Sequence, residues 1–145
     1  MQSFIQALQK DGVTVHIFNK NSIKEKQLYL FHENIKYLMI GSPRNTFDLS
    51  KCIEIRYGTS IDTLHPSLRG TPTLRGQCQN SSKDLCKSFS IIFSNGTIDI
   101  LTYDAACCKY LARGFSSLCV YIHLERLKKE YKNNNNNNVV SSKGN

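Results

Sequence analysis

Tryptophan is absent from this chain of 145 residues, which holds only 3 prolines and 2 methionines. No apolar run approaches the roughly 20 residues that a membrane-spanning helix needs. The sequence motifs of zinc peptidases, serine hydrolases and phosphate-binding glycine loops are missing, and no set of cysteine and histidine residues has zinc-finger spacing. These absences favour a non-catalytic domain that uses neither a metal nor another cofactor.

Acidic residues are also few, with 11 Asp and Glu against 19 Lys and Arg, so the formal net charge is +8. Such an excess favours an anionic partner: phospholipid headgroups, nucleic acid or an acidic protein surface. We do not expect nucleic-acid binding, because no RNA-recognition motif accompanies the charge and aromatic and basic residues do not alternate along a strand.

The six cysteines are expected to be free thiols in a reducing cytosol, because the sequence opens without a secretory signal. Cys107 and Cys108 fall in a predicted helix, where acylation, redox chemistry and burial in the core are all conceivable. Burial is favoured, since buried helical thiols are usually inert. The four histidines are scattered without metal or triad spacing and are interpreted as structural.

Short strands dominate the first hundred residues. The pattern predicts a short helix over 3–10 with Ser3 as its N-cap, followed by strands over 13–18, 27–31, 35–40, 47–49 and 52–57. The polar segments 20–26 and 41–45 are interpreted as a turn and a loop. Strands over 88–93 and 97–102 flank Asn95-Gly96, the strongest short hairpin signal.

Residues 58–87 show neither the alternation of a strand nor the periodicity of a helix, and they include two of the three prolines. We interpret this segment as a long, mobile loop inserted between strands. After residue 132 comes a run of six asparagines, which cannot bury a core and predicts a disordered tail or linker over 133–145. The sequence therefore predicts one domain over 1–132.

A helix over 104–132 closes the domain. Asp104 is a plausible N-cap, because its carboxylate can accept from exposed amides of the first turn. Leu111, Phe115, Leu118 and Ile122 follow at spacings of four, three and four, which places them on one apolar stripe facing a core. Seven or so antiparallel strands closed by one such helix predict a mostly β barrel or sandwich.

Four stretches resemble the pleckstrin homology (PH) domain, especially the divergent type at the N-terminus of phosphoinositide-specific phospholipase C. The most specific is FDLSKCIEIRYG over 47–58, and the others are the opening helix with Gly12-Val13, SFSIIF over 88–93, and the start of the closing helix over 104–115. The resemblance implies a seven-stranded, strongly bent antiparallel barrel capped by the closing helix. Leu111 stands where that family has tryptophan.

The resemblance also implies a site for a phosphoinositide headgroup on the first hairpin, where Lys20, Lys24 and Lys26 match a pattern of cations. Lys36, Arg44 and Arg56 are candidate supporting cations. Lys26 replaces an arginine of the pattern and cannot offer its bidentate fork, so weaker attraction to anionic membrane is expected. Ile23 at the loop tip either inserts into the membrane or packs back on the barrel.

The resulting hypothesis is a monomeric, cytoplasmic membrane-targeting module, peripheral to the membrane and part of a larger signalling protein similar to phospholipase C. In the alternative, the lysines only solubilise a turn and the domain docks a protein through the 58–87 insertion or the basic end of the closing helix. A sensor of phosphatidic acid is a further alternative.

Overall fold

The computed structural model describes residues 1–78 and 82–143. Its centre is a seven-stranded sheet in the order β4-β3-β2-β1-β7-β6-β5, with every neighbouring pair antiparallel. The strands are β1 (Val13–Asn19), β2 (Ser22–Leu30), β3 (Tyr37–Ile40), β4 (Ser42–Asp48), β5 (Cys52–Tyr57), β6 (Ser88–Phe93) and β7 (Gly96–Leu101). A 3-10 turn, η1 (Leu49–Lys51), joins β4 to β5.

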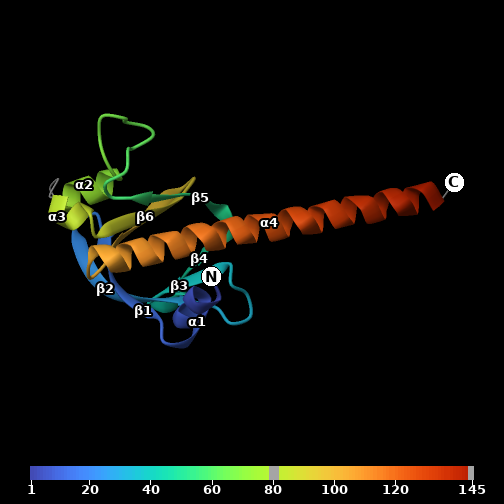
Figure 1. The fold of residues 1–145 in the computed structure, drawn as a ribbon, viewed down its shortest axis with the longest axis horizontal. Helices are drawn as coiled ribbons and strands as arrows, with labels where there is room; N and C mark the ends of the chain where they lie inside the picture. The colour runs from blue at the N-terminus through green and yellow to red at the C-terminus, as the bar shows by residue number, and fades with distance from the viewer. Residues whose placement is uncertain (79–81, 144–145) are drawn as a thin grey trace.

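Two helices complete the main core. The short α1 (Gln2–Lys10) packs near the start of the long α4 (Ala105–Lys143), which crosses the sheet and projects well beyond it (Figure 1). The predicted stripe of α4 is confirmed, since Leu111, Phe115 and Leu118 are fully buried and Ile122 is 8% exposed. We call the face of the sheet that packs on this core the inner face.

The predicted beginning of the closing helix is confirmed. The Asp104 carboxylate accepts a hydrogen bond of 2.7 Å from the amide of Cys107, as an N-cap does. The predicted cap of the first helix is wrong: that helix begins at Gln2, and Ser3 does not cap it. Phe4 of α1 lies directly over Gly114 of α4, where any side chain would collide with the ring. This close approach fixes α1 against α4.

A closed barrel is not formed. β4 and β5 are the two edges of the sheet, and no pairing joins them in the described ranges. The seven antiparallel strands, the short opening helix and the capping helix are as predicted. The Asn-Gly hairpin is also confirmed, with Phe93 paired to Gly96 across the turn.

Two of the predicted turns are largely strand. β2 begins at Ser22, so the segment 20–26 contributes only Lys20 and Asn21 to a two-residue turn. β4 begins at Ser42, so Gly41 alone remains of the loop predicted over 41–45. Pro43 misled the prediction, because proline lacks an amide hydrogen but is tolerated on an edge strand such as β4.

The 58–87 insertion is not a structureless loop. It contains α2 (Pro72–Cys78) and α3 (Ser82–Leu85). Leu74, Cys78 and Leu85 form a second apolar cluster with Phe18 on the outer face of β1. The apolar pattern of these helices is too short to predict them from the sequence, because each helix has fewer than two turns. Helices of this length are stabilised by tertiary packing.

The backbone of α4 remains helical to Lys143, through the asparagine run whose composition predicts a disordered tail. Adding residues to an existing helix avoids the cost of nucleation, so a polar extension can follow a well-packed helix. Residues 144–145 of the predicted tail lie outside the described residues.

Candidate functional site

The two lysines of the β2 strand lie on its inner face. Side chains alternate across a strand, so Lys24 and Lys26 share the face of Leu28 and Leu30, which are buried in the main core. Lys26 is half-buried and Lys24 is exposed, so the apolar row becomes cationic towards the β1–β2 turn. Glu25, between them, lies on the outer face opposite His16 of β1.

These lysines line a pocket of about 260 Å³ at the end of the inner face. Its apolar wall is built by Ile17, Ile40, Phe47 and Ile98. Its polar groups come from Asn19, Lys24, Lys26, Asn45 and Thr97, and its lining includes neither Asp nor Glu. A pocket with two cations, hydrogen-bonding side chains and no carboxylate suits an anionic ligand.

Gly41 at the β3–β4 turn helps to place Lys26. Its φ of +75° is a conformation that glycine adopts readily, and a Cβ there would lie 3.0 Å from Cδ of Lys26. The methylene chain of Lys26 thus lies against the backbone of the turn.

The remaining residues of the predicted hairpin site lie outside this pocket. Lys20 is exposed in the two-residue turn and is not part of the pocket lining. Ile23 is 49% exposed and lies on the outer face of β2, so it does not pack back on the main core. Both residues are accessible at the tip of the hairpin.

Lys36 and Arg44 are not brought together with the β2 lysines. Nζ of Lys36 lies 5.1 Å from the centre of the Tyr37 ring, and this lysine lines a different groove beside Arg126 and Lys129 of α4. Arg44 is exposed in β4, outside the lining of the candidate pocket.

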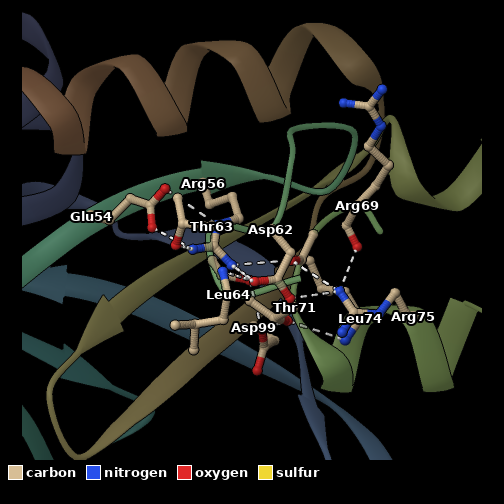
Figure 2. A network of polar contacts seen from close by, with 12 residues as sticks. Glu54, Arg56, Asp62, Thr63, Leu64, Arg69, Thr71, Leu74, Arg75 and Asp99 are labelled. Carbon is tan, nitrogen blue, oxygen red and sulfur yellow. Dashed lines mark hydrogen bonds and ion pairs between the residues drawn. The ribbon is translucent and has the colours of Figure 1, made fainter. Parts of the chain in front are cut away.

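Arg56 is a structural residue in this fold, with only 6% of its side chain exposed. Its guanidinium pairs with Glu54 at 2.6 Å and with Asp62 at 3.4 Å, and donates to the carbonyl of Gly70 and the hydroxyl of Thr63 (Figure 2). With these internal partners, it has no free edge to offer a headgroup. Arg56 is therefore not part of the candidate site, in contrast to the supporting role expected from the sequence.

Asp62 is the centre of this network at the base of the insertion. Its other oxygen pairs with Arg75 of α2 at 2.9 Å, and its backbone and side chain also hold the turn to His65. Burial acts to raise the pKa of Asp62, but hydrogen bonds from Arg75 and the Leu64 amide, together with the charges of both arginines, hold it below its ordinary value. Arg69 contributes only its carbonyl oxygen, and its guanidinium points away (Figure 2).

A second buried carboxylate, Asp99 of β7, joins the insertion to the sheet. It accepts hydrogen bonds from the hydroxyls of Thr71, Ser90 and Thr97, at 2.6, 2.6 and 2.7 Å. Every buried side-chain nitrogen or oxygen in the described residues has a partner. The sequence contained no signal for this network, because its members are up to 45 residues apart, from Glu54 to Asp99.

The six cysteines are free thiols in this structure. Burial raises the pKa of Cys108 to about 12, and burial also raises the pKa of the half-buried Cys107. Neither thiol is a ready nucleophile, because only the thiolate reacts. The preference for a packing role is consistent with this geometry.

Neither protein-family models nor curated proteins give a match to this chain. Along residues 1–78 and 82–143, no helix is both long and apolar enough to cross a membrane.

Proposed function

We propose that this chain is a non-catalytic membrane-targeting module that binds an anionic phospholipid headgroup through Lys24 and Lys26. The observation that carries the proposal is the pocket at the β1–β2 end, whose lining includes Lys24, Lys26 and hydrogen-bonding side chains but neither Asp nor Glu. The resemblance to PH domains supports it, because that family uses the same hairpin. A place in a larger, cytoplasmic signalling protein similar to phospholipase C belongs to the same proposal.

The proposed headgroup enters from the β1–β2 end, with Lys20 as an outer cation and Ile23 as a side chain available to the interfacial layer. Each lysine near an anionic bilayer adds about 1 kcal/mol of attraction. Three lysines therefore support micromolar rather than nanomolar binding unless the pocket adds specific hydrogen bonds. Asn19 and Asn45 are the side chains placed to supply them, since the hydroxyl of Thr97 already donates to Asp99.

Co-sedimentation with vesicles tests this proposal. Wild type and a Lys24→Glu/Lys26→Glu variant are compared on vesicles containing a phosphoinositide, phosphatidic acid or phosphatidylserine in a neutral lipid background. We expect binding to the anionic vesicles and its loss in the variant. Preference for one headgroup indicates use of the pocket, whereas equal binding to all three indicates attraction to surface charge.

The matched control is Lys109→Glu/Lys132→Glu, which changes the net charge equally at exposed positions on α4. If the control loses as much binding as the pocket variant, net charge alone explains the effect and the pocket is not the site. If wild type ignores every vesicle at low salt, the lipid proposal fails.

Protein docking is the second candidate function, and one observation favours it. The loop between β5 and α2 presents Ile61, Leu64 and Leu68, which are 50%, 83% and 43% exposed, on the rigid base formed by Asp62 and its arginines. Exposed apolar side chains gathered on an ordered loop often mark an interaction surface. An Ile61→Ser/Leu64→Ser variant that binds vesicles normally but loses a captured protein would support this function.

A further inference from the structure

The projecting part of α4 carries an apolar stripe that no other described segment covers. Val120, Leu124, Leu127 and Tyr131 are 57%, 52%, 56% and 68% exposed. Their spacings of four, three and four residues repeat the heptad seam of paired helices. Isolated exposed apolar residues are ordinary, but four in one helical line are not explained by chance exposure.

This stripe faces away from the domain to which α4 belongs. At 100° per residue, its mean direction lies roughly 150° from that of the buried stripe from Cys108 to Ile122. Figure 1 shows the same helix leaving the sheet and continuing alone. Because the two stripes lie on nearly opposite sides of α4, the domain cannot cover both of them at once. A surface that covers the exposed stripe must come from another molecule or segment.

We propose that the stripe pairs with the same stripe of a second copy of this chain, in an antiparallel, two-fold symmetric arrangement. In one register Leu124 faces Leu127 of the second copy, and Val120 faces its Tyr131. The two-fold axis repeats both contacts, so every member of the stripe meets an apolar partner. Such self-complementarity is what an isologous interface requires.

The residues that flank the stripe favour the antiparallel orientation. They then place His123 opposite Glu130 of the second copy, where an imidazole N–H can donate to the carboxylate, and Tyr121 opposite its Lys128. A parallel pair instead places His123 beside Lys128, which brings two basic side chains together, and leaves Glu130 beside the uncharged Asn135. Antiparallel packing also aligns the helix dipoles favourably.

The seam is short, and this sets the expected affinity. Twelve residues from Val120 to Tyr131 cover about 18 Å of helix. A standard protein interface buries about 800 Å² on each partner. A seam of this length, with four apolar side chains on each helix, buries less surface than that. We therefore expect a reversible dimer that forms at micromolar concentrations, in contrast to the monomer expected from the sequence.

Sedimentation equilibrium of the full chain over a wide concentration range tests the dimer. Leu124→Glu/Leu127→Glu is expected to weaken self-association by at least about tenfold, because charged residues in a seam lose its apolar contacts. Ile61→Glu/Leu64→Glu is the matched control, with the same charge change at two exposed aliphatic positions in the insertion loop. Circular dichroism verifies that each variant remains folded.

The orientation has its own test. Glu130→Lys breaks the proposed contact with His123 and weakens an antiparallel dimer several-fold, whereas a parallel dimer changes little. Glu125→Lys is the matched control: each glutamate pairs with a neighbour within α4, at 3.3 Å for Glu130 with Arg126 and 3.4 Å for Glu125 with Lys128. Only Glu130 flanks the seam, so only its substitution is expected to act.

Three outcomes overturn the proposal. Wild type that stays monomeric throughout excludes the dimer, and a dimer that survives Leu124→Glu/Leu127→Glu lies elsewhere. Wild type that is monomeric but loses binding to phosphatidylserine vesicles in the same variant assigns the stripe to a lipid surface instead. The first two outcomes do not bear on Lys24 and Lys26. The third is separated from the headgroup pocket by the Lys24→Glu/Lys26→Glu variant, which changes the pocket and leaves the stripe intact.

Discussion

The pocket at the β1–β2 end and the base of the insertion both contain cationic side chains, yet the fold uses them in opposite ways. At the base, Arg56 and Arg75 are 6% and 13% exposed and meet the carboxylate of Asp62 from two sides. At the pocket, Lys24 and Lys26 line an opening that contains no carboxylate. The arginines are held in ion pairs within the domain, whereas Lys24 and Lys26 form no ion pair with any residue that the structure describes.

The difference shows that the sign of the charge on a side chain says little about the role of that side chain until its partners are known. A buried charge pair is costly to break, because one partner remains desolvated and unpaired. A solvated cation contributes little to the stability of the fold and retains its charge for a ligand. Four predictions test this contrast, from the largest expected effect to the smallest.

Replacing Arg56 with alanine should cause the largest loss of stability. Removing a partner from a buried pair typically costs about 3–5 kcal/mol, and Glu54 and Asp62 both lose a contact here. Urea unfolding measures the loss. Lys24→Ala, the control at the pocket, should stay within about 0.5 kcal/mol of wild type. Vesicle binding that disappears in Arg56→Ala while the protein is still folded would contradict the division of roles.

Acid should weaken the insertion base before the pocket. The pKa of Asp62 is lowered in the folded state, so its contribution to stability is fully present above the pKa it has when unfolded. That contribution is lost as the pH falls from the unfolded pKa through the lower folded value. The free energy of unfolding, measured across this acidic range, should therefore fall with pH.

Asp62→Asn should flatten this acid dependence, because asparagine does not titrate. Asp11→Asn, at an exposed carboxylate at the end of α1, is the control and should leave the slope nearly unchanged. Equal slopes in wild type and Asp62→Asn would show that the arginine pairs do not shift this carboxyl group.

Replacing Lys26 with arginine should strengthen headgroup binding modestly. A guanidinium can donate two parallel hydrogen bonds to a phosphate, and a gain of about 1 kcal/mol is roughly fivefold in affinity. Lys20→Arg, in the exposed turn, is the control and should change affinity less. An equal gain from both substitutions would indicate a diffuse charged surface rather than a pocket.

The smallest expected effect concerns the link between the two regions. Gln77 of α2 donates hydrogen bonds to the carbonyls of Asn19 and Lys20, at 2.6 and 3.1 Å. Gln77→Ala should cost about 0.5–1 kcal/mol and increase amide hydrogen exchange at the β1–β2 turn. Gln6→Ala, at an exposed position of α1, controls for the change of residue type in a helix. Unchanged exchange at the turn would show that the insertion does not hold it.

Much of the secondary structure was readable from local patterns. The β-branched run CIEIRY predicted β5, although its alternation indicated the wrong buried face, since Ile53 is 65% exposed and Arg56 is buried. The Asn-Gly pair predicted the β6–β7 hairpin, and the spacing from Leu111 to Ile122 predicted the buried stripe of α4. These signals act over a few residues, where backbone geometry and burial of one face dominate. Predictions failed where tertiary contacts override local preference, at the edge strand β4 and in the short helices of the insertion.

The candidate site was predicted in part. Lys24 and Lys26 were named from the sequence, and the strand register places both on the inner face and Glu25 on the other. Arg56 was named for the same role, but its function depends on Asp62 and Gly70, which the insertion brings to it from later in the chain. No spacing pattern in the sequence predicts that these residues pair with Arg56.

By itself, the sequence determined most of the strands, the Asn-Gly hairpin and the buried face of α4, because these follow from residue periodicity and local turn chemistry. It also determined the excess of positive charge. Only the tertiary structure decided which cations pair internally and which line a pocket, that the sheet stays open, and that a second apolar stripe of α4 faces solvent. These outcomes depend on desolvation and on contacts between distant segments, and both are set by the packed fold rather than by any short stretch of residues.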